Sequence, residues 1–76
     1  MQEKLIILRK KNNISQETIS KYIGISKKSF CDKENGKYQF TIDEMFKIAE
    51  YFDMSIDQIF LPRILQNEVD ENKYVK

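Results

Sequence analysis

Residues 14–36, ISQETISKYIGISKKSFCDKENG, contain two helix-start signals separated by one glycine. Ser15 precedes a turn with an acidic residue, and a serine at such a place is a favoured helix N-cap. Gly24 adopts at little cost the positive φ that ends many helices, and Ser26 then offers a second N-cap. The pattern predicts a short helix after each serine, the second ending near residue 35, joined by a turn too short for an antiparallel pair.

The second of these helices carries few apolar residues. Phe30 is its one large hydrophobic side chain, so most of its surface is expected to face solvent or a polar partner. Lys27 and Lys28 lie in its first turn, where free backbone N–H groups also favour phosphate oxygens. Lysine binds guanine O6 and N7, and an aspartate such as Asp32 accepts from cytosine N4. This layout is typical of a helix-turn-helix that binds DNA, although a charged helix surface alone is common on soluble proteins.

Three polar residues at the two ends of this helix are candidates for contact with the DNA backbone. Ser26 precedes the helix, and Lys37 and Tyr38 follow it in the next loop. We assign all three side chains to phosphate contacts. Cys31 lies on the same helix as the lysines, where a single cysteine more often fills a small-residue position than acts as a redox switch.

Residues 5–60 resemble the XRE type of helix-turn-helix domain, the family of phage Cro and lambdoid repressors. The matching segments are LIILRKKNNISQ, SKYIGISKKSF, KENGK and TIDEMFKIAEYFDMSIDQIF, in order and without a gap. The resemblance implies an all-α, lambda-repressor-like bundle of about five short helices that contains the helix-turn-helix. We assign residues 1–61 to this DNA-binding domain and 62–76 to a C-terminal extension, a short helix followed by a frayed tail.

Carried over by position, the resemblance implies roles for individual residues. Lys27, Lys28 and Asp32 occupy the base-reading positions. Gln16, at the start of the helix expected after Ser15, lies beside a phosphate of the DNA backbone, and Ser29 lies near the DNA backbone. The operator sequence does not follow from a relative, because Asp32 stands where relatives often have Arg, Lys or Gln.

The resemblance also implies a structural ion pair between Arg9 in the first helix and Glu34 at the end of the third. Besides Asp32, Lys33 and Asp53 also depart from the family pattern. Lys33 stands where most members have an apolar residue, so either its aliphatic stem lies along the core or the third helix ends less firmly. Asp53 replaces a frequent glycine in the turn before the last helix, a conformation that Asp tolerates.

Charge divides the chain into two halves, although its net value is only +1. Residues 1–37 carry nine Lys and Arg against four Asp and Glu, a net charge of +5. Residues 38–76 carry four against eight, a net charge of −4. The basic half is expected to attract phosphates and the acidic half to face away from the duplex, although such an imbalance also arises by chance.

The second half is expected to provide scaffold and partner surface. Thr41 and Ser55 are N-caps of two further helices. Ile42, Met45, Ile48, Ala49 and Phe52 recur at helical spacing and predict one buried face. More large apolar residues remain than one small core requires; they either cover the edge of the core or form a homodimer contact that matches a palindromic operator. We assign four of them to the dimer contact: Phe60, Leu61, Ile64 and Leu65.

Composition excludes other classes of function. The 76 residues have no apolar stretch as long as a membrane span and no secretory signal, which favours the cytoplasm. They contain no histidine, no Gly-rich phosphate loop and no metal-ligand cluster, so we predict no catalytic residue, no metal, no cofactor and no small-molecule ligand domain. The expected function is that of a sequence-specific transcriptional regulator, a repressor that binds a palindromic operator in double-stranded DNA as a dimer. The alternative is a protein-interaction module on the same fold, such as an antitoxin or antirepressor.

Overall fold

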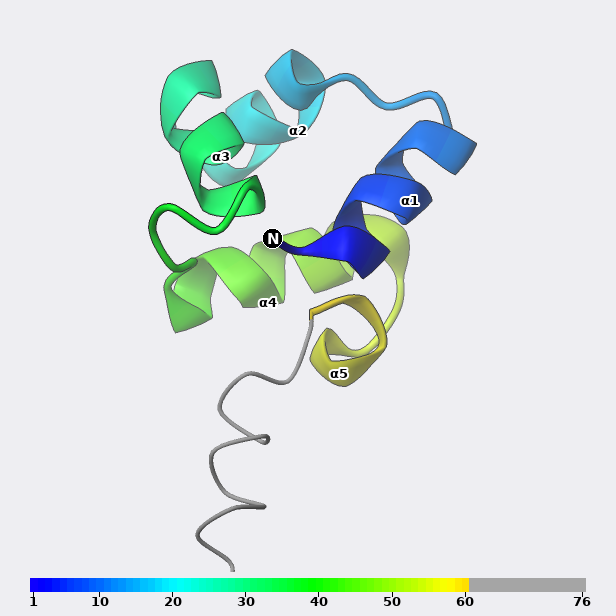
Figure 1. Ribbon diagram of the computed structural model, residues 1–76. Coiled ribbons are helices and arrows are strands. Elements are labelled where there is room, and N and C mark those ends of the chain that lie inside the picture. Colours follow the sequence, from blue (N-terminus) through cyan, green and yellow to red (C-terminus); the bar gives the residue numbers. More distant parts are fainter. Residues whose placement is uncertain (61–76) are drawn as a thin grey trace, which may run out of the picture.

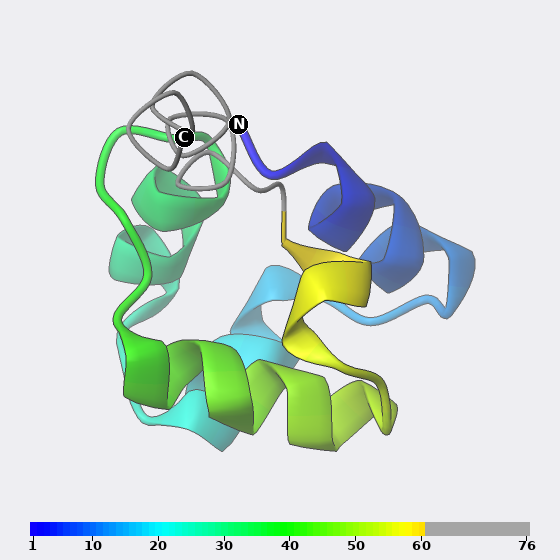
Figure 2. The same cartoon turned by 90° about the horizontal axis from the view of Figure 1, so that it is seen from below.

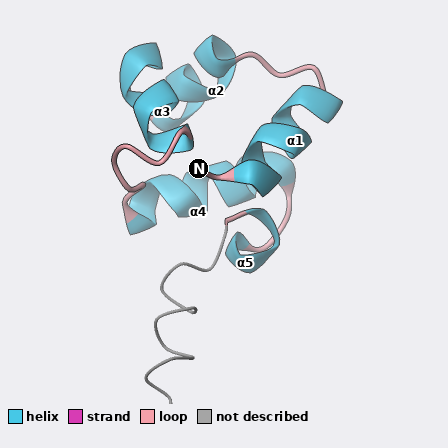
Figure 3. Ribbon diagram, in the orientation of Figure 1, coloured by secondary structure: helices cyan, strands magenta, loops and turns pink. Residues whose placement is uncertain are grey.

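The computed structural model describes residues 1–60, which form five α-helices and no strand (Figures 1 and 3). The all-α prediction is therefore confirmed. The predicted extension over 62–76, with the predicted dimer contacts Leu61, Ile64 and Leu65, lies outside the described residues. The helices are α1 (Glu3–Lys11), α2 (Gln16–Ile23), α3 (Lys27–Glu34), α4 (Ile42–Phe52) and α5 (Ile56–Ile59).

Side-chain caps set the starts of α2, α3 and α4. The hydroxyl groups of Ser15, Ser26 and Thr41 each accept a hydrogen bond from the backbone N–H three residues further on, at 3.0 to 3.1 Å. Two of the helices, α2 and α4, end at left-handed residues. Gly24 ends α2 with φ 84°, and Asp53 ends α4 with φ 56°, which an aspartate tolerates better than most residues. These local interactions explain why the predicted boundaries of α2, α3 and α4 are confirmed to within a residue.

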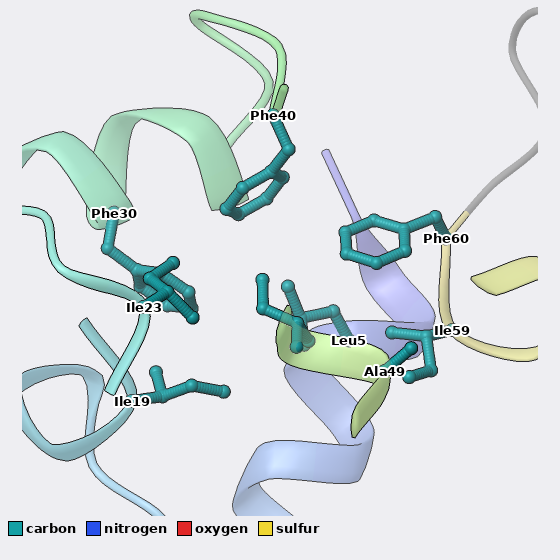
Figure 4. Close-up of a cluster of buried hydrophobic side chains, with 9 residues drawn as sticks. Leu5, Ile19, Ile23, Phe30, Phe40, Ala49, Ile59 and Phe60 are labelled. Atoms are coloured by element: carbon teal, nitrogen blue, oxygen red, sulfur yellow. The ribbon is translucent and has the colours of Figure 1, made fainter. Parts of the chain in front are cut away.

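The core has an aromatic centre (Figure 4). The ring of Phe40 packs edge to face against Phe30 of α3, at 5.6 Å between centroids, and against Phe60 after α5, at 5.4 Å. Aliphatic side chains from the other helices surround these rings. The buried apolar residues are Leu5, Ile19, Ile23, Phe30, Phe40, Ile48, Ala49, Ile59 and Phe60.

Two predictions about apolar residues are wrong. Phe60, assigned to a dimer contact, is only 4% exposed and packs inside its own chain. Ile42, assigned to the buried face of α4, is the first residue of that helix and is 59% exposed. Ile48 and Ala49 are buried as predicted. Helical spacing identified the buried face of α4 correctly, but it did not show how far along the helix the rest of the domain covers that face.

The helices place α3 at one edge of the molecule. Helix α2 packs on both α3 and α4, and α1 packs on α3 and α5. Seen from below, α3 and its loop to α4 lie at the left edge, α1 at the right and α4 along the bottom (Figure 2). One surface of α3 therefore remains uncovered by the other described helices.

Candidate nucleic-acid interface

The turn between α2 and α3 is closed by backbone hydrogen bonds. The N–H of Gly24 donates to the carbonyl oxygens of Ser20 and Lys21, and the N–H of Ile25 donates to that of Ser20. Ser26 then begins α3 directly, so only three residues separate the two helices. The two helices pack against each other across this turn. This is the helix-turn-helix arrangement that the sequence predicted.

Two of the three predicted base-reading residues lie on the uncovered surface of α3, and the third, Asp32, is half-buried, with 21% of its side chain exposed. Lys27 and Lys28 are exposed in its first turn. Lys28 Nζ lies 3.3 Å from Asp32 Oδ2, one turn further along. The structure therefore brings Lys28 and Asp32 together, and the carboxylate offsets part of the positive charge of this surface. This ion pair was not predicted from the sequence, although a spacing of four residues on a helix is the signal for such a pair.

A shallow open groove adjoins the start of α3. It lies where the C-terminal end of α1 meets the N-terminal ends of α2 and α3. The free backbone N–H groups at the start of α2 and the nearby cationic side chains suit it to a phosphate group. Its lining residues are Arg9, Lys10, Ser15, Gln16, Glu17 and Lys27.

A buried polar network lies beneath this groove. Arg9 Nε and Nη2 donate to the two carboxylate oxygens of Glu34 at 2.9 and 3.1 Å. Gln16 Nε2 donates to Glu34 Oε1 at 2.9 Å, and Arg9 Nη1 donates to the carbonyl oxygen of Ile14. Arg9 is 8% exposed and Glu34 is 1% exposed. The predicted partners Arg9 and Glu34 thus lie together and join α1 to the end of α3.

The link from Gln16 to Glu34 was missed by sequence reasoning, which placed Gln16 only beside a phosphate. In the protein without DNA, the side-chain amide nitrogen of Gln16 already donates a hydrogen bond to Glu34. The hydrogen bond fixes the side chain at the start of α2, at the rim of the groove. No periodic signal marks a pair eighteen positions apart, because the contact depends on how α2 and α3 pack.

A second ion pair holds the end of α3 to α4. Lys33 Nζ lies 2.7 Å from Glu44 Oε1 and 2.8 Å from Oε2, and both side chains are mostly buried. Burial alone would raise the pKa of Glu44, but the hydrogen bonds from Lys33 and from the Thr41 backbone, with the charge of Lys33, lower it below its usual value. Lys33 therefore keeps its stem in the domain and finds a partner. The alternative of a loosely ended third helix is not supported.

The predicted backbone-contact residues surround α3. Ser26 caps the helix, and Ser29 is half-buried in its first turn. Lys37 and Tyr38 are exposed in the loop before α4, where Lys37 Nζ lies 5.9 Å from the centre of the Tyr38 ring. Ser26 and Ser29 thus lie at the start of α3 and Lys37 and Tyr38 after its end, whereas Gln16 is the first residue of α2 and reaches the end of α3 through Glu34.

Two kinds of feature are absent from residues 1–60. None of their helices is long and apolar enough to cross a membrane. In the same part of the chain, no group of three or more His, Cys, Asp or Glu side chains is placed to hold a metal ion.

Comparison with known proteins agrees with this arrangement. The helix-turn-helix family profile matches residues 5–59. An uncharacterized HTH-type transcriptional regulator of Methanocaldococcus jannaschii is 36% identical over 61 residues, which cover 80% of this chain and 92% of that protein. A second uncharacterized HTH-type transcriptional regulator, from Archaeoglobus fulgidus, is 31% identical over 61 residues, 80% of this chain and 86% of that protein.

The fold also has a solved counterpart. A transcriptional regulator from Listeria innocua superposes with a TM-score of 0.72 at 16% identity, over 97% of this chain and 75% of that one. At that identity the likeness concerns the fold alone. The chain belongs to the helix-turn-helix family, of the XRE type, whose members are DNA-binding transcriptional regulators.

Proposed function

We propose that this protein is a cytoplasmic, sequence-specific regulator that represses transcription by binding a palindromic operator in double-stranded DNA as a homodimer. The observation that carries the proposal is the position of Lys27 and Lys28. Both lie exposed at the start of α3, while the other end of α3 is held by Glu34 and Lys33. A helix fixed at one end and cationic at the other is suited to enter a major groove.

The charge distribution supports this use of α3. Residues 1–37 carry the basic half of the chain, and they include α1, α2 and α3. Residues 38–60 include α4 and α5 and contain one lysine against five Asp and Glu. The attraction to phosphates is therefore concentrated around the candidate interface.

The proposed dimer accounts for the strength of binding and for the symmetry of the operator. One recognition helix of eight residues contacts a short stretch of DNA, so two copies are needed for a long site. A two-fold dimer places its recognition helices in successive major grooves, about 34 Å apart, and so requires a palindromic site. With Phe60 buried, the proposed contacts beyond α5 are Leu61, Ile64 and Leu65.

A second candidate is a protein-interaction module on the same fold, such as an antitoxin or antirepressor. It is favoured by the two large apolar side chains of α4 that are more than half exposed, Ile42 and Phe46. The two functions differ in their dependence on salt. DNA binding weakens steeply as salt rises, whereas an apolar protein contact changes little.

Selection of bound fragments from random duplexes, followed by sequencing, tests the proposal. We expect enrichment of an inverted repeat. The affinity for the enriched duplex should fall steeply as the salt concentration rises from about 50 to about 200 mM, as it does for proteins that contact several phosphates. Failure to enrich any sequence, with weak binding to all duplexes at low salt, would contradict DNA-based regulation and favour the protein-interaction module.

A further inference from the structure

Helix α3 holds a cation and an anion side by side on the side that the other helices leave open. Lys28 Nζ lies 3.3 Å from Asp32 Oδ2, and the two residues are one turn apart. The Lys28 side chain is 81% exposed and that of Asp32 is 21% exposed. Within residues 1–60, the other two ion pairs of α3 join it to α1 and to α4. The Lys28–Asp32 pair joins α3 to no other helix, so the packing of the domain does not require it.

Neither stability nor attraction to phosphates explains this pair. An ion pair with one strongly exposed partner contributes little to the stability of a helix. The carboxylate of Asp32 also cancels the charge of Lys28 and repels the DNA backbone, so it weakens nonspecific binding. Hydrogen bonding to the edges of bases is the use that remains, because there an acceptor is as informative as a donor.

The spacing of the two charged atoms matches one base pair. In the major groove, a G·C pair presents the acceptors N7 and O6 of guanine and then the N4 amino group of cytosine. O6 and N4 are hydrogen-bonded to each other within the pair, so they lie about 2.9 Å apart. Lys28 Nζ and Asp32 Oδ2 are separated by 3.3 Å. The ammonium group can therefore donate to O6 and N7 while the carboxylate accepts from the second N4 hydrogen.

The other base pairs match this arrangement less well. In an A·T pair the N6 donor lies between two acceptors, N7 and thymine O4, so a carboxylate that binds N6 also faces an acceptor. A reversed C·G pair places the amino group against Lys28 and the acceptors against Asp32. Lys28 alone discriminates poorly, because its flexible stem can follow guanine to either strand. The short side chain of Asp32 therefore supplies the polarity.

We propose that Lys28 and Asp32 read a single G·C base pair of the operator as a unit. Lys28 donates to guanine, and Asp32 accepts from N4 of the paired cytosine and so determines which strand carries the guanine. Lys27 takes part in no ion pair within residues 1–60 and stays available for phosphates or other bases. The inference rests on the proposed function and names one base pair of the DNA that the protein selects.

Parallel selections from random duplexes with the parent, D32A and D43A test the assignment. Asp43 is exposed in the first turn of α4, so D43A removes the same charge away from α3. The parent and D43A should select the same operator. D32A should lose the preference for G·C over C·G at the position that each α3 reads, and keep the other preferences. Reversal of that pair should weaken parent binding about tenfold or more, and D32A binding by about threefold at most.

A modified base tests the contact with cytosine without any change to the protein. Each cytosine of the selected operator is replaced in turn by N4-methylcytosine, in which a methyl group takes the place of the amino hydrogen in the major groove while Watson–Crick pairing is kept. At the position that Asp32 reads, the parent and D43A should lose about tenfold in affinity, and D32A should lose little.

The outcomes separate this inference from the proposed function. A parent that tolerates N4-methylcytosine at every position would overturn the reading of cytosine by Asp32 and leave DNA binding intact. Equal sensitivity of the parent and folded D32A, or selection of an unchanged operator by D32A, would overturn it as well. A parent that selects no sequence at all would contradict both the inference and the proposed function.

Discussion

Helices α3 and α4 are held in the domain by different forces. α4 is eleven residues long, begins with a capping box and buries an apolar face that includes Ile48 and Ala49. α3 is eight residues long and buries one large apolar side chain, Phe30. Its remaining attachments are polar and lie near its C-terminal end, where Glu34 binds Arg9 and Gln16 and Lys33 binds Glu44.

This difference shows how a short helix can be fixed while its surface stays free. Apolar packing around α3 would have required more hydrophobic residues on it, and these would have covered or replaced the cationic first turn. Buried hydrogen-bonded charges position a helix with few contacts, but the loss of one partner leaves the other charge buried and unpaired. The domain should therefore be more sensitive to changes in the polar links of α3 than to changes in its exposed ion pairs.

The largest effect is expected for Arg9→Ala, which leaves the buried Glu34 carboxylate without its main partner. The free energy of unfolding should fall by about 3 to 5 kcal/mol. Urea unfolding at pH 7 measures it. Lys21→Ala is the control, because it removes only the exposed pair with Glu17, at 3.6 Å, and should cost less than about 1 kcal/mol. Equal losses for the two variants would show that the buried network does not position α3.

The next effect concerns the link from α3 to α4. Glu44→Gln keeps an oxygen that can accept from the Thr41 backbone but removes the charge that pairs with Lys33. The free energy of unfolding should fall by about 1 to 3 kcal/mol at pH 7. Because the pKa of Glu44 is lowered in the folded protein, its charge contributes stability above the ordinary value of 4.5, and this contribution is lost as the pH falls below it.

The pH dependence separates this link from a general effect of substitution. The gap in stability between the parent and Glu44→Gln should therefore narrow as the pH falls below about 4.5. Glu17→Gln, on the exposed surface of α2, should show a small gap at every pH. A gap for Glu44→Gln that stays constant down to pH 3 would contradict an ion pair with Lys33.

The same two helices show what the sequence can and cannot predict. The starts of α2, α3 and α4 follow from Ser15, Ser26 and Thr41, because a cap acts on the backbone only three residues away. Burial of individual apolar residues was less predictable. Ile42 was expected to be buried and is exposed, and Phe60 was expected at a dimer surface and is buried, since an apolar pattern does not show which surfaces other helices cover.

Polar contacts between helices were the hardest part. The pairing of Lys33 with Glu44, eleven positions apart, depends on the path of the loop between α3 and α4. The sequence offered two alternatives for Lys33 and no partner. Arg9 and Glu34 were paired only through the family resemblance, because their spacing of twenty-five residues carries no periodic signal. Roles in DNA contact for Lys27, Lys28 and Asp32 stay predictions.

A smaller effect is expected for the Lys28–Asp32 ion pair of α3. Asp32→Asn removes the carboxylate that lies 3.3 Å from Lys28 and so leaves that lysine free to bind phosphate. Affinity for nonspecific DNA should rise a few-fold, and the slope of log affinity against log salt should steepen by up to about 1. Asp53→Asn removes the same charge after α4 and should change neither quantity. If both variants behave alike, the Lys28–Asp32 pair has no part in DNA binding.

The central claim is that the start of α3 binds the operator. Competition binding to the selected duplex, with K27A/K28A against the control K4A/K21A, tests it most directly, because both variants lose two exposed lysines and the same net charge. K27A/K28A should keep normal helicity and lose at least about 2 kcal/mol of operator affinity, with a much smaller loss for K4A/K21A. Equal losses, or unchanged affinity of folded K27A/K28A, would contradict the assignment of α3 as the recognition helix.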